Sequence, residues 1–246
     1  MSEDESVSLM LNEEDHIRIQ VISGGLSLSA LLDKANAIDD LISDAMPYAF
    51  DEKLGYLTSS PINVGTGLRA SVMMCLPALG ASGKIDQLID EVSQYGVTIR
   101  SCYGEGNKNV AYLYQICNNK TLGISEADII DNMNTIVDQV IKQERRRREF
   151  LLESNFDKYV DQVYRSYGVL RYAKQITTID AMTLLAQIKF GYDAKIITSE
   201  VTPSIYKLMM AIQPANLQKI LGKNAGTKER EKARAQFLNH NLPELV

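Results

Sequence analysis

The amino-acid sequence predicts an α+β protein in which an antiparallel sheet flanked by helices precedes an all-helical region. Apolar residues alternate with polar ones in residues 6–11 and 17–21, and again after residue 96, as in half-buried strands. From Glu153 to the end only helical periods remain. We therefore expect two domains, residues 1–152 with the sheet and residues 153–246 with helices only.

Composition excludes several functional classes. The 246-residue chain has a net charge of -5, which argues against general nucleic-acid binding because that requires a basic surface. Its three cysteines lack the spacing of a zinc site or a disulfide framework. No apolar run reaches membrane-spanning length, and the acidic residues 1–5 are unlike the start of a signal peptide. We therefore expect a cytoplasmic protein without membrane or nucleic-acid partners.

Between the first two predicted strands, residues 12–18 combine three acids with a histidine and an arginine. In an extended conformation, Glu14, His16 and Arg18 would point to one face. A carboxylate and a guanidinium would then share a surface. The stretch is either a site for a cationic group or a solvated acidic turn.

Next come a helix and an irregular loop. Apolar residues at helical spacing predict a helix over residues 27–46, with Ser27 or Ser29 as its N-cap. Pro61, Gly65 and Gly67 then indicate an irregular backbone leading into a helix from about Leu68. Arg69 would lie in its first turn, where backbone amides can bind an anion, although an ordinary helix cap explains the glycines equally well.

Two further arginines resemble Arg69 in their setting. A helix over residues 85–92 stops at Gly96, and a strand follows with Arg100, a turn with Glu105, and another strand over residues 110–117. Arg18, Arg69 and Arg100 each lie beside a polar or irregular turn. We expect them to converge on one site, the alternative being three surface arginines.

The remaining elements are helical. Ser125 is expected to cap a long helix that ends in the basic run of residues 145–148, which we interpret as a solvated face. Later helices are expected to run from Thr177 to Gly191, from Thr202 and from Thr227.

In the last helix Arg230 and Arg234 are four residues apart and share a face. They form either a surface ion-pair ladder or a pocket for a phosphorylated side chain. Phosphate-loop, serine-hydrolase, zinc-protease and protein-kinase motifs are absent from the sequence, and two histidines do not suffice for a metal site.

Three motifs together resemble the phosphagen kinase (ATP:guanidino phosphotransferase) family, and most of all its bacterial protein-arginine kinase branch. They are Asn12-Glu13-Glu14-Asp15-His16-Ile17-Arg18, Pro61-x-Asn63-Val64-Gly65-Thr66-Gly67-Leu68-Arg69-Ala70, and Arg100-x-x-Tyr103-Gly104-Glu105-Gly106. The order of the motifs is also that of the family, and the resemblance covers essentially the whole chain.

The resemblance implies transfer of the ATP γ-phosphoryl group, with Mg²⁺, to arginine guanidino groups of proteins. It implies Glu14 as the catalytic base and Glu105 as a second acid that holds the substrate guanidinium. Nucleotide-binding residues implied in the same way are Arg18, then Arg69, Ala70, Ser71, Val72 and Met73, then Arg100, Ser101, Cys102, Tyr103, Gly104 and Glu105.

The C-terminal motif resembles the phosphoarginine pocket through which the family is allosterically controlled. Here it reads Arg230-Glu231-Lys232-Ala233-Arg234-Ala235, with Glu231 where the family usually has Asp. Ser60 likewise replaces a reactive cysteine, so we expect insensitivity to thiol oxidation. The small N-terminal lobe and the Ser-x-Arg-x-Arg strand of the family do not occur ahead of Asn12. We therefore expect a fragment, an internal start or a shortened relative.

By the same resemblance, phosphorylated proteins would be directed to a Clp-type protease, with a zinc-binding activator protein as partner, and the chain is compatible with a homodimer. The alternative function is a truncated, non-catalytic module that binds phosphoarginine and regulates a partner. A kinase for creatine or free arginine is disfavoured, because such enzymes lack the helical tail.

Overall fold

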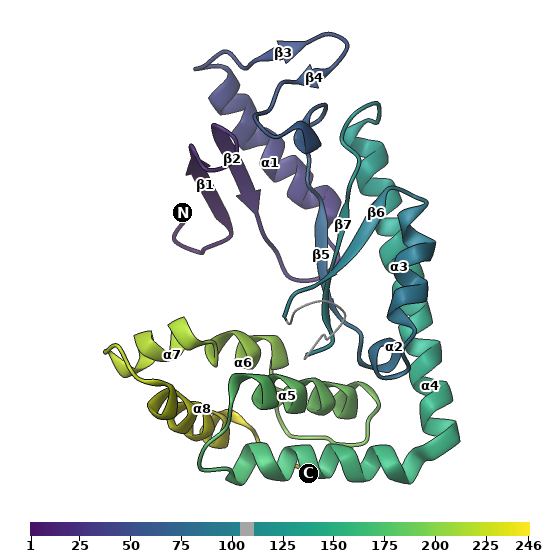
Figure 1. The fold of residues 1–246 in the computed structure, drawn as a ribbon, viewed down its shortest axis with the longest axis vertical. Helices are drawn as coiled ribbons and strands as arrows, with labels where there is room; N and C mark the ends of the chain where they lie inside the picture. Colours follow the sequence, from purple (N-terminus) through teal and green to yellow (C-terminus); the bar gives the residue numbers. More distant parts are fainter. Residues whose placement is uncertain (104–110) are drawn as a thin grey trace. The chain divides into compact units, whose positions relative to one another are not determined.

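The computed structural model describes residues 1–103 and 111–246 (Figure 1). Contacts divide the chain into two compact units. Unit 1 comprises Met1–Met73, Asp86–Arg100 and Gln115–Ile141, and unit 2 comprises Met74–Ile85, Ser101–Tyr114 and Lys142–Val246.

Unit 1 begins with the antiparallel hairpin of β1 (Val7–Leu11) and β2 (Ile17–Val21), as the alternating pattern predicted. Leu9 lies opposite Ile19 in its register. Helix α1 (Leu28–Ser43) follows, with Ser27 at its N-cap position. A short hairpin, β3 (Phe50–Asp51) and β4 (Gly55–Tyr56), then leads to the 3-10 turn η1 (Pro61–Asn63). The predicted order of strand, strand and helix is confirmed.

A three-stranded sheet with the order β5-β7-β6 follows. Its strands are β5 (Ser71–Cys75), β6 (Val97–Ser101) and β7 (Leu113–Asn118). The amide of Asn118 donates to Ala70 and the amide of Leu76 to Tyr112, which sets an antiparallel register between β5 and β7.

The helix predicted from Leu68 is therefore wrong, because residues 68–70 are irregular and β5 begins at Ser71. Val72 is β-branched and Ser71 is a weak helix former, so local preference does not oppose the strand. Pairing with β7, more than 40 residues later in the chain, then decides the conformation.

Helix α3 (Ile85–Ser93) ends before Gly96, whose φ of 72° explains the glycine there. Helix α4 (Glu126–Tyr172) starts behind Ser125, whose hydroxyl accepts the amide of Asp128 at 3.1 Å. Figure 1 shows α3 and the first part of α4 running along the sheet, where Val97, Ile99 and Ile116 are buried.

The basic run does not end α4, contrary to our prediction. The helix continues to Tyr172 and is interrupted at Asn155, where φ is -154°. Arg147 donates to Ser82 at 2.7 Å and Arg148 pairs with Asp193 at 3.6 Å, so two of the four arginines are anchored within unit 2. Apolar residues just beyond the run pack on the core and extend the helix.

Four shorter helices complete the C-terminal part of unit 2: α5 (Thr178–Asp193), α6 (Ile205–Ala211), α7 (Pro214–Leu221) and α8 (Thr227–Asn241). Their core includes the buried side chains of Leu185, Met209 and Leu238. Thr177 caps α5 as predicted, accepting the amide of Asp180. Two boundaries differ, because Ser204 rather than Thr202 precedes α6, and Gly191 lies within α5.

Gly191 serves close packing rather than helix termination. A Cβ built on it would lie 2.5 Å from a methyl carbon of Val163, so only glycine fits there without displacing that side chain.

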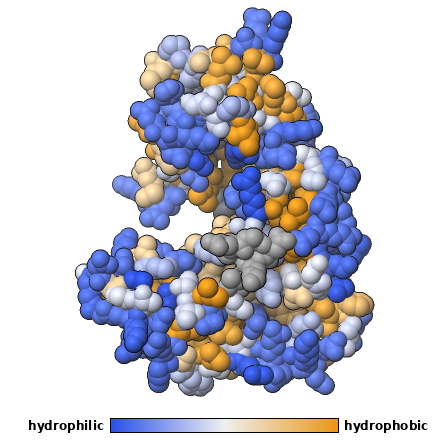
Figure 2. Space-filling model, in the orientation of Figure 1, coloured by the Kyte–Doolittle hydropathy of each residue, from blue (hydrophilic) through white to orange (hydrophobic). Residues whose placement is uncertain are grey.

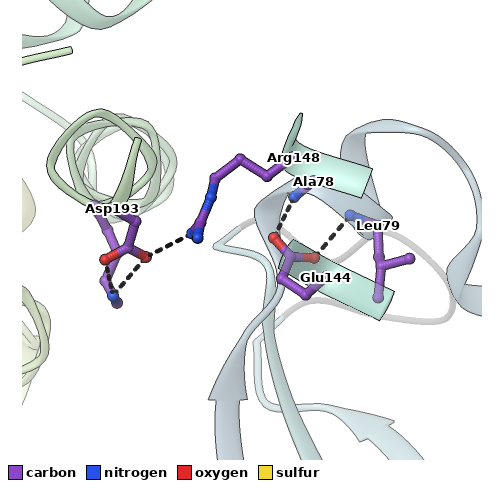
Figure 3. A network of polar contacts seen from close by, with 6 residues as sticks. Ala78, Leu79, Glu144, Arg148 and Asp193 are labelled. Carbon is purple, nitrogen blue, oxygen red and sulfur yellow. Dashed lines mark hydrogen bonds and ion pairs between the residues drawn. The ribbon is translucent and has the colours of Figure 1, made fainter. Parts of the chain in front are cut away.

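A buried carboxylate joins the short helix α2 (Pro77–Ala81) to α4 (Figure 3). The Glu144 carboxylate accepts the amides of Ala78 at 2.8 Å and Leu79 at 2.9 Å. Burial raises the pKa of Glu144 in spite of these two bonds and of the nearby Arg148. The interaction satisfies two amides at the start of α2.

Most of the face seen in Figure 2 is hydrophilic, with patches of hydrophobic residues between the hydrophilic ones. At its upper end, where Figure 1 places β3 and β4, Phe50, Leu54 and Leu57 are exposed. Among the described helices, none combines the length and the apolar composition that crossing a membrane requires.

Candidate nucleotide and guanidinium site

The acidic stretch is the turn that joins β1 to β2. Asn12 adopts a φ of 53° and its amide donates to the carbonyl of His16 at 3.0 Å, which closes the turn. Glu14 is exposed at its tip. Because these residues are not extended, the expected grouping of Glu14, His16 and Arg18 on one strand face does not form.

Arg18 pairs instead with Glu13. Their side chains lie 3.1 Å apart and are each 50% exposed. The pKa of Glu13 is lowered first by a hydrogen bond from the backbone of Glu14 and then by that from Arg18. The carboxylate of Glu14 takes no part in this ion pair.

Asp15, on the same turn, binds the loop before β5. One carboxylate oxygen accepts the amides of Ser59 at 2.7 Å and Ser60 at 3.2 Å, and the other accepts the Asn63 side-chain amide at 2.8 Å. Partial burial opposes ionisation, but these three donors together lower the pKa of Asp15. The turn that carries Glu14 is thereby fastened to residues 59–63.

Arg69 is held from two sides. Its Nε donates to the side-chain oxygen of Asn63 at 3.1 Å, and its Nη1 donates to the backbone carbonyl of Asn118 at 3.0 Å. The buried side chain of Asn118 accepts the amide of Ala70 and donates to the carbonyls of Leu68 and Lys120. Both backbone and guanidinium of Arg69 are therefore fixed, although the residue itself remains exposed.

The sheet register places several predicted nucleotide-binding residues on one face. Backbone bonds set Arg100 and Met73 on either side of Gln115, and Arg69 lies two residues before Ser71 on the same side of β5 as Met73. Residues paired across antiparallel strands share a face. Arg69, Ser71, Met73, Gln115 and Arg100 accordingly form an exposed strip, in which Met73 and Arg100 are about 10 Å apart.

Ala70 and Val72 alternate to the opposite side, and Ala70 is buried. They can contribute backbone atoms to a site on the exposed face, but not side chains.

The other predicted residues fall in unit 2 or outside the described residues. The hydroxyl of Ser101 donates to the carbonyl of Tyr103, and burial raises the pKa values of the Cys102 thiol and the Tyr103 phenol. Gly104 and Glu105 lie outside the described residues. Within the part of the chain that is described, histidine, cysteine and acidic side chains form no cluster suited to a metal ion.

In the C-terminal motif, the two arginines have different environments. Arg234 is 2% exposed and donates from Nε to the carbonyl of Ile212 at 3.1 Å and from Nη1 to that of Ile176 at 3.0 Å. Burial lowers its pKa. Arg230 is only partly buried and donates to the carbonyl of Ala225. Lys232 is exposed, Ala233 is half-buried and Ala235 lies in the core.

An open cavity of about 480 Å³ adjoins this motif, and Glu231 lines it. Its other lining residues are Val169, Gln175, Ile176, Thr177, Asp180, Thr183 and Leu184. Glu231 accepts a hydrogen bond from the amide of Gln175 at 2.6 Å. The cavity thus combines apolar walls with the carboxylates of Asp180 and Glu231, and this combination suits a guanidinium.

Sequence reasoning did not single out Asp15, Asn63 or Asn118 as functional. Asp15 and Asn63 lie inside two of the family motifs, and this position was the one signal in the sequence that could have pointed to them. The bonds of Asp15 to Asn63 and of Asn118 to Arg69 and Ala70 span 48 or 49 residues of chain, so no local pattern reveals them.

Comparison with known proteins shows the family. Residues 1–147 match the model of the ATP:guanido phosphotransferase C-terminal catalytic domain, and residues 157–245 match the Protein-arginine kinase McsB C-terminal domain. The chain therefore belongs to the ATP:guanido phosphotransferase family.

Curated relatives identify the branch. Proteins described as protein-arginine kinase from Halothermothrix orenii and Clostridium kluyveri are each 43% identical over 242 residues, and that from Caldanaerobacter subterraneus is 44% identical. The matches cover 98% of this chain and between 69% and 72% of those proteins. Within the family, the chain is placed among the protein-arginine kinases.

Solved structures agree on the fold. A taurocyamine kinase from Schistosoma mansoni with bound transition-state-analog components is similar with a TM-score of 0.53 and 25% identity, over 67% of this chain and 24% of that one. A lombricine kinase is similar with a TM-score of 0.52 and 28% identity, over 58% of this chain and 40% of that one. Both are named as kinases, in agreement with the family match.

Proposed function

We propose that the chain transfers the γ-phosphoryl group of Mg-ATP to a guanidino nitrogen of arginine residues in proteins. The family membership supports the reaction class, and the named relatives support a protein arginine as acceptor. The observation that carries the proposal is the geometry of unit 1. A doubly held Arg69 shares a sheet face with Arg100, and its partner Asn63 is bonded to the turn that presents Glu14.

Cationic side chains on that face suit a polyphosphate. Arg69 and Arg100 would neutralise charge on the phosphate oxygens, which is the main contribution that a protein makes to phosphoryl transfer. Because Asn63 and Asn118 engage Nε and Nη1, the Arg69 guanidinium is oriented before the nucleotide arrives. Arg18, held by Glu13, would act at the edge of the site. Mg²⁺, bound together with ATP, would supply further positive charge to offset that of the phosphates.

The acceptor needs a base. A guanidinium has a pKa far above neutral pH, so its proton must leave to a positioned base as the new N–P bond forms. We assign this proton to the carboxylate of Glu14, while the P–O bond to the β-phosphate breaks and ADP departs with the electron pair. Glu105 is proposed to hold the other guanidino nitrogens. The same two acids would distinguish arginine from hydroxyl acceptors, since they match a fork of N–H donors.

Replacing Glu14 by Gln tests this assignment, because Gln keeps the size and removes the base. We expect kcat to fall by about 10²- to 10⁴-fold with little change in the KM for ATP. Glu52→Gln, at an exposed site in the loop between β3 and β4, is the matched control and should keep wild-type kinetics. A Glu14→Gln variant with the control's kcat would contradict the assignment.

We also propose that the cavity beside Glu231 binds an arginine or phosphoarginine side chain and gives the protein its regulation. The carboxylates of Glu231 and Asp180 support recognition of the guanidinium end, and Arg230, at the more accessible end of the motif, is the candidate phosphate ligand. Titration with free phosphoarginine should show binding that Glu231→Gln weakens about tenfold, the cost of one charged hydrogen bond. Unchanged affinity in the variant would place the ligand elsewhere. Binding without any kinase activity would favour the non-catalytic regulatory module.

Finally, we propose a cytoplasmic role in which arginine phosphorylation directs proteins to a Clp-type protease, with a zinc-binding activator protein as partner. The support is the protein-arginine kinase branch itself. A purified Clp-type protease should degrade a substrate treated with the wild-type chain and Mg-ATP, and should leave intact a substrate treated with Glu14→Gln. Equal degradation of both would contradict this role.

A further inference from the structure

The Asp15, Asn63 and Arg69 side chains form a chain of hydrogen bonds in which each donor and acceptor is fixed. Arg69 donates to Asn63, and Asn63 donates to Asp15. The carboxylate of Asp15 can only accept, so the Asn63 side chain must present its Nδ2 to it. The oxygen of that amide consequently faces Arg69 and accepts Nε. An acid on the β1–β2 turn thereby determines the orientation of a guanidinium that precedes β5.

The two oxygens of Asp15 have separate tasks. Oδ1 accepts both backbone amides, those of Ser59 and Ser60, and so fixes the loop. Oδ2 alone accepts Asn63 and so fixes the amide. A substitution that changes only the Oδ2 position can therefore break the link to Arg69 while the loop stays attached.

We propose that Asp15 and Asn63 are positioning residues that hold the Arg69 guanidinium ready for the ATP phosphates and couple it to the turn that carries Glu14. This inference rests on the proposed function, because it assumes that Arg69 binds phosphate. Neither residue touches the reacting atoms. Their contribution is to order a flexible arginine in advance, so that nucleotide binding does not bear that entropic cost.

A purely architectural role is the competing explanation, since Asp15 also closes a loop. An exchange of the two residues separates the explanations. Asp15→Asn places two amide donors against each other, and Asn63→Asp places two carboxylates against each other. In the double variant, the amide introduced at position 15 keeps its oxygen for the loop and donates its nitrogen to the carboxylate introduced at position 63. The second oxygen of that carboxylate accepts Arg69, so the hydrogen-bond chain is complete again with the same polarity toward Arg69.

The first readout is the KM for ATP together with kcat. Each single variant should raise the KM for ATP about tenfold, as expected for loss of one hydrogen bond to a charged group, with a smaller change in kcat. The double variant should return to within about threefold of wild type. Asp51→Asn is the matched control, because Asp51 also accepts two loop amides, those of Lys53 and Leu54, at a site outside the network, and it should leave the KM unchanged.

The second readout is independent of activity. In protein labelled with ¹⁵N-arginine, the Nε–H resonance of Arg69, assigned by its loss in Arg69→Lys, should exchange slowly with water in the wild type. Asp15→Asn should accelerate this exchange, because nothing then orients the Asn63 amide toward Arg69, and the double variant should slow it again. If the wild-type chain shows no kinase activity, the proposed function fails, but this resonance still decides whether the network holds Arg69.

Two results would overturn the inference. One is a pair of single variants with wild-type KM and, in Asp15→Asn, an unchanged Arg69 resonance, which would make the network irrelevant to the guanidinium. The other is a double variant no better than the single ones, which would mean that Asp15 and Asn63 serve the loop alone.

Discussion

Arg234 offers a direct test of whether the C-terminal motif is structural or binds phosphate. Its guanidinium is 2% exposed and binds two backbone carbonyls, those of Ile212 and Ile176. The lysine of Arg234→Lys keeps the charge but cannot reproduce two bonds from two differently placed nitrogens. At least one buried carbonyl is then left without its charged donor.

A hydrogen bond to a charged group contributes about 1.5–3 kcal/mol, and an unsatisfied buried carbonyl costs a similar amount. We therefore expect Arg234→Lys to lower the free energy of unfolding by about 3 kcal/mol. For a chain of this size, that corresponds to a fall of about 6–12 °C in the unfolding midpoint. Arg230→Lys, one helical turn earlier and only partly buried, should cost at most about 1 kcal/mol.

Differential scanning calorimetry of the three proteins measures both effects. The structural interpretation predicts a clear separation of the two variants. A midpoint for Arg234→Lys within about 2 °C of that for Arg230→Lys would refute it. Loss of phosphoarginine binding in Arg234→Lys would strengthen that refutation. Lost binding together with an unchanged midpoint is expected of an arginine that binds phosphate rather than backbone carbonyls.

Two further predictions concern stability. Glu144→Gln should cost about 1–3 kcal/mol, because Gln offers one acceptor to the two amides of α2. Since the folded pKa of Glu144 lies above its ordinary value of 4.5, its contribution is fully present below pH 4.5 and declines as pH rises through the folded pKa. Urea titrations should thus show that the difference in the free energy of unfolding between wild type and Glu144→Gln narrows as pH rises. A difference that widens with pH would contradict this reasoning. Gly65→Ala should cost about 2–5 kcal/mol, because φ is 112° and the added Cβ would collide with the carbonyl oxygen of Thr121. Gly67→Ala, with φ 65° and its nearest neighbour at 4.0 Å, should cost only about 1 kcal/mol, and equal losses in thermal melts would count against this packing argument.

Local patterns predicted much of the fold. The alternation in residues 6–11 and 17–21 located the first hairpin, and Ser125 and Thr177 located two helix starts through their hydroxyl caps. In each case the information lies within a few residues of the element. The antiparallel sheet with a helical C-terminal region followed from the same periodicities.

Contacts between distant segments account for the errors. The stretch after Leu68 became a strand because β7 pairs with it, and α4 continued past Arg148 because its side chains are anchored within unit 2. For the site, the motifs singled out Glu14 and Arg69, but the pairing of Arg18 with Glu13 depends on how the turn folds. The role of Asp15 could not be found at all without the loop that it binds.

The central claim is that this chain phosphorylates arginine in proteins. The most direct test is to incubate the purified chain with Mg-ATP and an arginine-rich acceptor protein, and then to map the peptides by mass spectrometry under conditions that preserve acid-labile N–P bonds. Glu14→Gln is the parallel control. We predict phosphate on arginine side chains with the wild-type chain and its near-absence with the variant. A folded wild-type chain that binds ATP and leaves every arginine unmodified, or that places phosphate on hydroxyl groups, would contradict the account.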